Sequence, residues 1–420
     1  MRTKILFIYL FLVCPAISLL AQIDSEIILQ KVKEASGELN VLRGYLHERP
    51  ELSGKEFETA KFLKAEIAKL GLPIVNVPGT GFYALLDTKR PGKTIGLRAD
   101  IDALPVQESE TNLKQEKRYV SKNTGVSHVC GHDGHMAVLL EAAKILTGLK
   151  NLLNGKIIFI FEEGEETASG IDAMVEALKP LAIDAIYGNH LKSNLASGML
   201  YIQEGAIMAG TGTVAFDVIG RGGHGSRPDL SINPVFAAAN ILTGLSIAWN
   251  NQRDITQTVT LGITQIQGGE ANNVIPNTAF VGGTIRFFDV DEAEKCFEVI
   301  RKVSENIAAA HNCTVKFHEA NGTLLNPVVN DTALTLFTRE AVRQIYPDRI
   351  VSGDRYKWYG AEPFSKYSLL APTVFVFAGI QNDAFGSGAE HHNDQFDLDE
   401  EALPYALGAM VQFAVCSLNK

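Results

Sequence analysis

Metal-binding side chains occur in five short clusters of this chain, and each cluster follows a run of residues typical of a β-strand. Cysteine, histidine and glutamate are common ligands of divalent cations such as zinc. Because parallel strands end at one edge of a sheet, side chains that follow them meet there. The repetition predicts a two-metal hydrolytic centre formed by Cys130, His132, Glu165, Glu166, His190 and His392, with Asp100 behind them.

The first cluster is a loop rich in glycine and histidine, residues 127–135, which precedes a predicted helix. Its glycines let the backbone fold so that the Cys130 thiolate and the His132 imidazole point to one spot. Both donors suit zinc or a similar cation. For this segment taken alone, the alternative is a glycine-rich turn whose histidines only cap the helix or form hydrogen bonds.

Four glutamates and one glycine, in the order Glu-Glu-Gly-Glu-Glu, follow the predicted strand at residues 157–161. Carboxylates this close repel one another unless cations neutralise them, and adjacent side chains of an extended backbone point apart. We therefore predict that Glu166 binds metal while Glu165 faces the attacking water as the general base. The alternative is a solvated acidic loop.

Two further histidines follow strand-like runs: His190 comes after residues 185–187, and His392 lies beyond residues 373–377. A lone histidine is more often structural than a ligand. If each of these groups were only structural, however, independent coincidences would have to place all of them at the same end of the sheet. Asp100, after the strand at residues 94–97, is predicted to support a ligating imidazole or thiolate from behind; a structural pair with Arg98 is the alternative.

Two glycine-rich clusters later in the chain are candidates for substrate binding. They are residues 220–226, which include His224, and residues 268–276, which include Asn273; Arg286 lies on the following predicted strand. Arg286 and Asn273 could grip a carboxylate through charge-assisted hydrogen bonds. The alternative is a pair of hairpin turns with a surface arginine.

Strands and helices alternate through residues 82–187, which predicts an α/β fold with a largely parallel sheet covered on both faces. From about residue 211 the order becomes β-α-β-β-α-β, that of a ferredoxin-like module. The α/β pattern resumes after residue 322. We therefore expect a catalytic domain of residues 22–208 and 323–420, interrupted by an inserted module of residues 209–322.

Composition sets broad limits on function. The chain has 420 residues, 46% of them hydrophobic and 20% charged, so it is long enough for two globular domains. Its formal net charge of -10 argues against a nucleic-acid partner, which would need a basic face. Its five cysteines form no disulfide framework; a Cys296–Cys313 bridge is one alternative, and buried free thiols are expected for all but Cys130.

Residues 1–21 have the three regions of a secretory signal peptide: basic residues, an apolar run too short to span a membrane, and small residues up to Ala21. We therefore expect an exported protein, periplasmic or secreted, with no transmembrane segment after signal removal. Val13 and Pro15 are poor neighbours for a lipid on Cys14, so an exported protein without a lipid anchor is favoured.

Together these motifs resemble those of the two-metal aminoacylases and peptidases, a family that includes hippurate hydrolases and the plant auxin-conjugate amidohydrolases. The resemblance spans nearly the whole chain after residue 21. The matching segments are His47-Glu48-x-Pro50-Glu51-Leu52, residues 98–105, Cys130-Gly131-His132-Asp133, Glu165-Glu166, Gly188-x-His190, Gly222-Gly223-His224, Asn273-Val274-Ile275-Pro276 and His392.

The resemblance implies a role for each site residue. The implied metal ligands are Cys130, His132, Glu166, His190 and His392, and the implied base is Glu165. The module would be a lid and dimerisation domain of a homodimer, and its His224 would reach the active site of the partner subunit and stabilise the oxyanion there. Two segments depart from the family pattern: residues 162–164 replace the usual Gln-Pro-Ala, and the loop at residues 391–394 is unusual.

We therefore expect a metal-dependent amidohydrolase that cleaves N-acyl amino acids or short peptides. Zinc, manganese and cobalt all tolerate this mixture of donors. A carboxypeptidase or dipeptidase on the same scaffold would have the same centre and differ only in the pocket on the acyl side. A non-catalytic exported binding module is a third interpretation, against which the complete ligand set and Glu165 argue.

Overall fold

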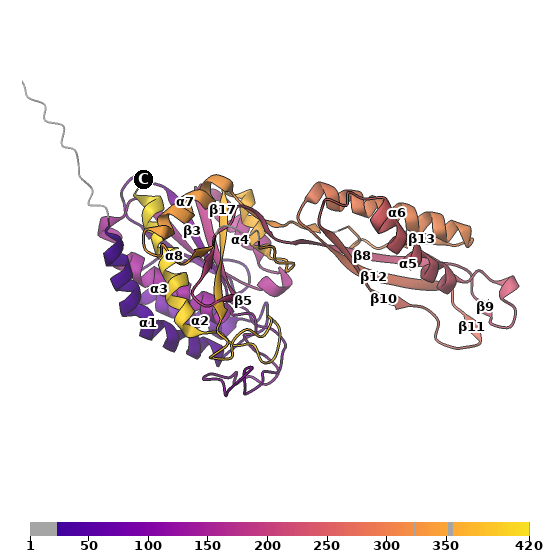
Figure 1. Cartoon of the computed structure of the whole chain (residues 1–420), viewed down its shortest axis with the longest axis horizontal. Coiled ribbons are helices and arrows are strands. Elements are labelled where there is room, and N and C mark those ends of the chain that lie inside the picture. Colours follow the sequence, from indigo (N-terminus) through magenta and orange to yellow (C-terminus); the bar gives the residue numbers. More distant parts are fainter. Residues whose placement is uncertain (1–22, 323, 352–355, 420) are drawn as a thin grey trace, which may run out of the picture.

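Two large β-sheets and two short strand pairs organise the residues that this computed structural model describes, 23–322, 324–351 and 356–419 (Figure 1). The predicted signal peptide lies outside these residues. The larger sheet has eight strands, in the spatial order β1 (Ile74–Asn76), β2 (Phe82–Asp87), β4 (Lys156–Glu162), β3 (Thr94–Asp100), β5 (Ala185–Ala196), β17 (Thr373–Gln381), β6 (Leu200–Tyr201) and β16 (Ile350–Val351).

The centre of the larger sheet is parallel and its edges are not. Strands β4, β3, β5 and β17 run parallel to one another. Strand β2 pairs antiparallel with β4, β1 with β2, and β6 with β17. The predicted α/β fold with a mostly parallel sheet is therefore confirmed, with antiparallel strands added at both sides.

Helices and buried side chains cover both faces of this sheet. On one face pack α1 (Ser25–His47), α2 (Phe57–Lys69), α3 (His132–Gly148), α7 (Thr332–Arg343) and α8 (Leu403–Leu418), and on the other α4 (Ile171–Leu178) with the 3-10 turn η5 (Pro363–Leu369). Successive strand residues alternate between the two cores: Phe159 belongs to the first, and Ile158 and Ile160 to the second. Strands buried on both faces are apolar throughout, which explains the continuous hydrophobic runs.

One helical segment of the described chain, Glu400–Leu418, is long and apolar enough to cross a membrane. It packs against α1, α3 and α7, and 78% of its most apolar 18-residue window is buried in the fold. Burial in the protein core therefore accounts for its composition.

The smaller sheet has the predicted β-α-β-β-α-β order. Its elements are β8 (Gly210–Ile219), α5 (Pro234–Asn251), β10 (Val259–Gln267), β12 (Thr278–Phe287), α6 (Val290–Ala310) and β13 (Thr314–Phe317). The strands pair antiparallel in the order β10-β12-β8-β13, and both helices pack into one core against them. Cys296 and Cys313 are buried in that core as free thiols, so the alternative of a bridge between them is excluded.

The chain enters and leaves the smaller sheet at adjacent positions. Strand β7 (Gly205–Met208) leads into it, β15 (Val328–Asn330) leads back, and the two pair antiparallel. Strand β14 (Leu324–Leu325) still pairs with β8, so the smaller sheet extends slightly beyond the boundary predicted at residue 322.

Candidate metal centre

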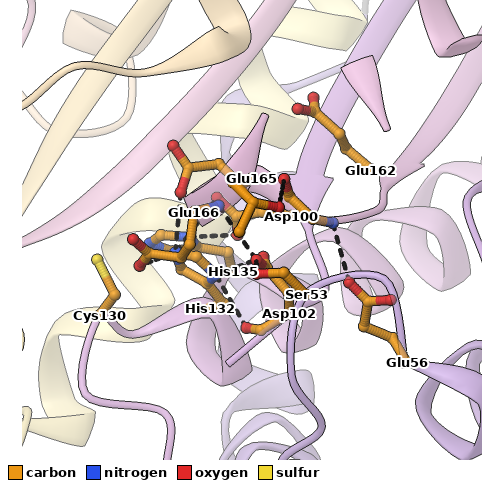
Figure 2. Close-up of polar contacts among 12 residues, drawn as sticks. Ser53, Glu56, Asp100, Asp102, Cys130, His132, His135, Glu162, Glu165 and Glu166 are labelled. Carbon is orange, nitrogen blue, oxygen red and sulfur yellow. Dashed lines mark hydrogen bonds and ion pairs between the residues drawn. The ribbon is translucent and has the colours of Figure 1, made fainter. Parts of the chain in front are cut away.

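The predicted metal ligands converge at the carboxyl ends of the central parallel strands. Figure 2 shows Cys130, His132 and Glu166 among them. Two groups of three residues share Cys130: one adds His132 and His190, and the other adds Glu166 and His392. In each group the candidate ligand atoms lie within 4.8 Å of one another. All five predicted ligands therefore fall into two adjoining sets that share one sulfur.

The two residues of the glycine-rich loop are positioned by the start of α3. Gly131 has a φ of 92° and immediately precedes the helix, so His132 occupies its first turn and Cys130 lies just outside it. This left-handed conformation favours glycine. The turn orients the side chains of Cys130 and His132 toward the edge of the larger sheet.

His190 lies inside β5 rather than after it, which corrects the predicted end of that strand at residue 187. β5 continues to Ala196, and His190 is in register with Phe377 of β17. The local residues gave no sign of this extension, because pairing with β17, far along the chain, sustains the strand.

Main-chain carbonyls set the tautomers of both candidate imidazole ligands. His132 Nδ1 lies 3.0 Å from the Asp102 carbonyl oxygen, and His190 Nδ1 lies 2.6 Å from that of Leu191. Each Nδ1 therefore donates a proton and each Nε2 presents a lone pair. His190 Nε2 faces the Cys130 sulfur at 3.7 Å, and His132 Nε2 has no hydrogen-bond partner among the described residues.

His135, a neighbouring buried imidazole, has both nitrogens occupied. Its Nδ1 donates to Asp100 Oδ1 at 2.8 Å, and its Nε2 accepts from the Leu191 N–H at 2.9 Å. Although His135, Asp100 and His132 lie close enough to share an ion, His135 has no lone pair left for one. It supports the centre without being a candidate ligand.

Asp102, rather than Asp100, supports the candidate ligand His132. Asp102 Oδ1 lies 3.2 Å from His132 Nδ1, and its Oδ2 accepts from the Glu166 N–H at 3.1 Å and the Ser53 hydroxyl at 2.6 Å. Asp100 instead binds Arg98 at 3.0 Å and His135. The predicted support of a ligand by Asp100 is thus indirect, and the alternative of an Arg98–Asp100 pair is present.

The four glutamates at the end of β4 and just after it have different partners, and Figure 2 shows Glu162 apart from Glu165 and Glu166. Glu162 is neutralised by Arg98 Nε at 2.8 Å and accepts from the Tyr367 hydroxyl at 2.7 Å, and Glu163 accepts from the Thr80 N–H. The guanidinium of Arg98 is thus the cation that balances Glu162. Only the pair at residues 165 and 166 faces the cysteine and histidines.

Glu165 and Glu166 point into the candidate centre from the 3-10 turn η2 (Glu165–Thr167). Glu165 Oε2 lies 3.9 Å and Glu166 Oε1 3.7 Å from His132 Nε2. Glu166 Oε1 is buried without a hydrogen-bond partner among the described residues, and it lies 3.3 Å from His392 Nε2. The two carboxylates therefore occupy neighbouring but different positions around the same imidazole.

The protonation of the site indicates a deficit of positive charge. Burial opposes protonation of His132, but the carboxylates of Asp100 and Asp102 outweigh it and raise its pKa to about 10. Burial, with Glu166 and Glu165, raises the pKa of the Cys130 thiol well above its ordinary value. Burial, with Glu362 and Glu166, does the same to the pKa of Glu165. A bound cation reverses all three shifts.

The residues present fit a pair of divalent cations. Two buried ligand atoms, His132 Nε2 and Glu166 Oε1, lack hydrogen-bond partners in the described chain and face each other across the site. Buried polar atoms are normally paired, so orphaned atoms that converge call for a ligand. Nitrogen, sulfur and carboxylate oxygen together are a donor set for zinc or a similar transition metal.

A cavity of about 540 Å³ opens over this centre and reaches the smaller sheet. Cys130, Glu165, Glu166, His190 and His392 line it from one side, and Arg286 of β12 from the other. The Arg286 guanidinium donates to Thr284 Oγ1 at 2.9 Å and to Thr211 Oγ1. No ion pair joins it to a carboxylate of the described residues, and burial lowers its pKa. It is therefore available to an anionic ligand.

The structure does not bring the other two predicted site residues into this cavity. His224 of β9 (Gly223–His224) and Asn273, just before β11 (Val274–Ile275), lie together, since His224 pairs with Val274 and Gly225 N–H donates to the Asn273 carbonyl at 2.8 Å. Figure 1 shows β9 and β11 at the end of the smaller sheet that is remote from the larger one. Within one chain, Asn273 is thus separated from Arg286, its predicted partner.

Sequence reasoning missed two residues that shape the cavity. Glu362 lines it and accepts from Arg98 Nη2 at 2.9 Å; burial, opposed by Arg98, raises the pKa of Glu362 to about 7. Trp358 lines the same cavity, its ring 4.8 Å from that of His190. No local motif marks either position, because both reach the site only through long-range packing.

The fold and the centre define a metal-dependent hydrolase of the kind that acts on linear amide bonds. Residues 96–415 match the family described as Peptidase family M20/M25/M40, and the chain belongs to it. This confirms the resemblance inferred from the motifs.

Relatives within the family differ in the activity that their names give. The chain is 33% identical over 398 residues to thermostable carboxypeptidase 2 of Saccharolobus solfataricus, which covers 93% of this chain and 98% of the relative. It is 35% identical over 381 residues to the N-acetylcysteine deacetylase of Bacillus subtilis, with coverages of 90% and 96%.

A solved structure agrees with the metal centre as well as with the fold. The chain superposes on a dinuclear metal-binding M20 peptidase of Bacillus subtilis with a TM-score of 0.79 and 32% identity, covering 92% of this chain and 99% of the other. Dinuclear metal binding is thus present in a close structural relative.

Proposed function

We propose that this protein is a two-metal amidohydrolase that cleaves the amide bond of N-acyl amino acids. The observation that carries the proposal is the pair of ligand groups that share Cys130, with the orphaned His132 Nε2 and Glu166 Oε1 facing each other. Cys130, His132, Glu166, His190 and His392 would hold the ions. We propose zinc or manganese, and cobalt as a substitute.

The chain's own residues would carry the proton transfers. When bound, two divalent cations polarise an amide carbonyl and lower the pKa of a water molecule. Glu165, whose carboxylate lies beside Glu166 and His132, takes a proton from the attacking water and delivers it to the leaving nitrogen. Water and amide are thereby converted to a carboxylic acid and a free amine.

Arg286 is the proposed anchor for the substrate carboxylate. It lines the cavity opposite the metal centre, and threonine hydroxyls rather than acids hold its guanidinium. A guanidinium without an acidic partner favours a carboxylate through charge-assisted hydrogen bonds. An N-acyl amino acid offers a carboxylate at one end and an amide close to it.

His224 and Asn273 would act on a second copy of the chain. They lie together at the remote end of the smaller sheet, with His224 exposed, so they cannot serve the cavity of their own chain in this arrangement. We propose a homodimer in which each supplies the other's oxyanion and substrate contacts. Phe236 and Ile247 of α5, 68% and 62% exposed, support an interface on the smaller sheet.

Subunit complementation tests the dimer directly. Chains with Glu165→Gln and chains with His224→Ala would each be inactive alone. Mixed after dissociation, they would form hybrid dimers in which one site has both an intact Glu165 and a partner's intact His224, and activity would return. Two inactive variants that stay inactive when mixed would contradict catalysis across subunits.

A metal and substrate panel tests the activity. The purified protein, freed of metal and reloaded with zinc, manganese or cobalt, is assayed for bound ions per chain and for hydrolysis of N-acyl amino acids and dipeptides. We expect two ions per chain and faster release of amino acid from the N-acyl substrates. A protein that binds neither ion and hydrolyses none of the panel would overturn the proposal.

A carboxypeptidase is the second candidate, favoured by the relative from Saccharolobus solfataricus. Its centre would be the same, because the ions act on the amide bond whatever lies on the acyl side. Faster cleavage of dipeptides than of N-acyl amino acids in the panel would support it. We also propose that the protein is exported, on the basis of residues 1–21; detection of a shortened chain outside the cytoplasm would test this.

A further inference from the structure

His392 has a backbone conformation that is unfavourable for a residue with a side chain. Its φ is 67°, in the left-handed region that residues other than glycine rarely adopt, and its side chain is 50% exposed. Its N–H donates to the Val129 carbonyl at 2.9 Å. Since such conformations persist only where the surroundings enforce them, the loop around His392 must be held in place.

Two contacts fasten this loop to β5 immediately before His392. His391 Nε2 accepts from the Ser193 N–H at 3.2 Å, and Glu390 Oε1 binds Lys192 Nζ at 3.0 Å. The Lys192 side chain is fully buried, and His391 is 8% exposed. The loop at residues 390–392 is thus tied to consecutive residues of the strand that also carries His190.

Some main-chain amides of β5 on the side of β3 lack a strand partner, because β3 is shorter than β5. β3 pairs with β5 only as far as Gly188, so the Leu191 and Ser193 amides further along that edge have no strand partner. Side-chain imidazoles accept from them instead: His135 from Leu191 and His391 from Ser193. An acceptor at residue 391 therefore completes the hydrogen bonding of the sheet edge.

The His391 ring also contacts the first ligand group through His190. Its centroid is 5.1 Å from that of His190 at an interplanar angle of 78°, and 5.1 Å from those of Trp358 and Phe396. Because its Nε2 accepts a main-chain proton, His391 does not offer that atom to an ion. His391 is thus connected to both ligand groups: its ring contacts His190, and it precedes His392 in the chain.

We infer that His391 is a positioning residue for the second ion. By accepting from Ser193, with Glu390 on Lys192 beside it, His391 holds the loop so that His392 turns its Nε2 to 3.3 Å from Glu166 Oε1. The inference rests on the proposed function, since it takes His392 and Glu166 as ligands. It gives a role to the loop at residues 391–394, which departs from the family pattern.

Matched substitutions of His391 distinguish the role of its hydrogen-bond acceptor from the role of its ring. His391→Phe keeps a flat ring among its aromatic neighbours and removes the acceptor, whereas His391→Gln keeps an acceptor at similar reach and removes the ring. His318→Phe and His318→Gln are the controls, because His318 Nε2 binds Asp217 at 3.0 Å on the smaller sheet. Lys192→Met is a second test variant, which breaks the neighbouring tie to Glu390.

Metal-free protein is titrated with Co²⁺. The measured quantities are the number of ions bound per chain and the visible absorption of the thiolate and cobalt bands. We expect wild type, His391→Gln and both controls to bind two ions. His391→Phe should keep the ion of the Cys130, His132 and His190 group and bind the second roughly 10- to 100-fold more weakly, the usual effect of removing a support behind a metal ligand. Lys192→Met should weaken the same ion selectively.

Three outcomes would overturn the inference: His391→Phe binds both ions as wild type does, His391→Gln loses the second ion as fully as His391→Phe, or both ions weaken together. If His391→Phe does not fold, as judged by near-ultraviolet circular dichroism, Lys192→Met decides. Wild type that fails to bind two ions would refute the proposed function instead, so the two failures are distinguishable.

Discussion

Asp102 is the residue whose replacement best tests the geometry of the metal centre. Its carboxylate accepts from three donors: His132 Nδ1 on one oxygen, and the Glu166 N–H and the Ser53 hydroxyl on the other. It therefore supports two of the candidate ligands at once. Burial opposes its ionisation, but the hydrogen bonds from His132 and Ser53 prevail and lower its pKa.

Asp102→Asn preserves the size of the side chain but leaves one oxygen where two are needed. The amide nitrogen must face either His132 Nδ1–H or the Glu166 N–H, and both are donors. Losing one hydrogen bond to a charged acceptor costs about 1.5 to 3 kcal/mol. If that cost falls on the metal-bound state, the dissociation constant of the metal rises roughly 10- to 150-fold.

The assay is competition for zinc or cobalt against a chelator of known affinity, with metal-free and metal-loaded protein compared by thermal unfolding. Asp217→Asn is the matched control, because Asp217 also binds a histidine, His318 at 3.0 Å, but lies on the smaller sheet. The control should bind metal as wild type does. Metal affinity of Asp102→Asn equal to that of wild type would show that this carboxylate does not orient the ligands.

Three further predictions follow from the site. Glu165→Gln should keep its metal content and lose roughly 10²- to 10⁴-fold in kcat; turnover close to wild type would remove Glu165 as the base. Arg286→Met should raise KM roughly 10- to 150-fold for substrates with a free carboxylate and leave carboxyl-amidated analogues little affected; equal loss on both would exclude the carboxylate anchor. Because the metal-free pKa of His132 is about 10 and that of the Cys130 thiol is raised by burial, metal loading at neutral pH should release about two protons, and occupancy should fall on acidification; calorimetric heats that do not depend on the buffer would contradict this.

Elements with strong local patterns could be predicted from the sequence. The β-α-β-β-α-β order of the smaller sheet, for example, is the one that the pattern predicted. The strands that end at the site could also be found, because buried parallel strands are continuous apolar runs with polar residues at their ends. Placing Glu166 at the sheet edge followed from this topology, whereas His190 lies within β5 and Cys130 is positioned by the start of α3.

The partners of the charged groups could not be predicted in the same way. Glu162 and Glu163 look like Glu165 and Glu166 in sequence, yet Arg98 neutralises the first, which also accepts a hydrogen bond from Tyr367, and the second accepts from the Thr80 amide. Which carboxylate a cation must balance depends on residues far along the chain. The same limit explains why Asp102 was overlooked beside Asp100, two residues earlier on the same segment.

The paired strands β7 and β15 connect the two parts of the chain that line the cavity. Every candidate ion ligand comes from the larger sheet and its loops, whereas Arg286, the cavity's guanidinium, comes from the smaller one. If Arg286 anchors the substrate as proposed, substitutions around β12 should change which acids are accepted while the candidate ion ligands stay in place. Substrate selectivity could then change during evolution while the metal centre stays the same. A laboratory library aimed at new substrates would begin with the residues around β12.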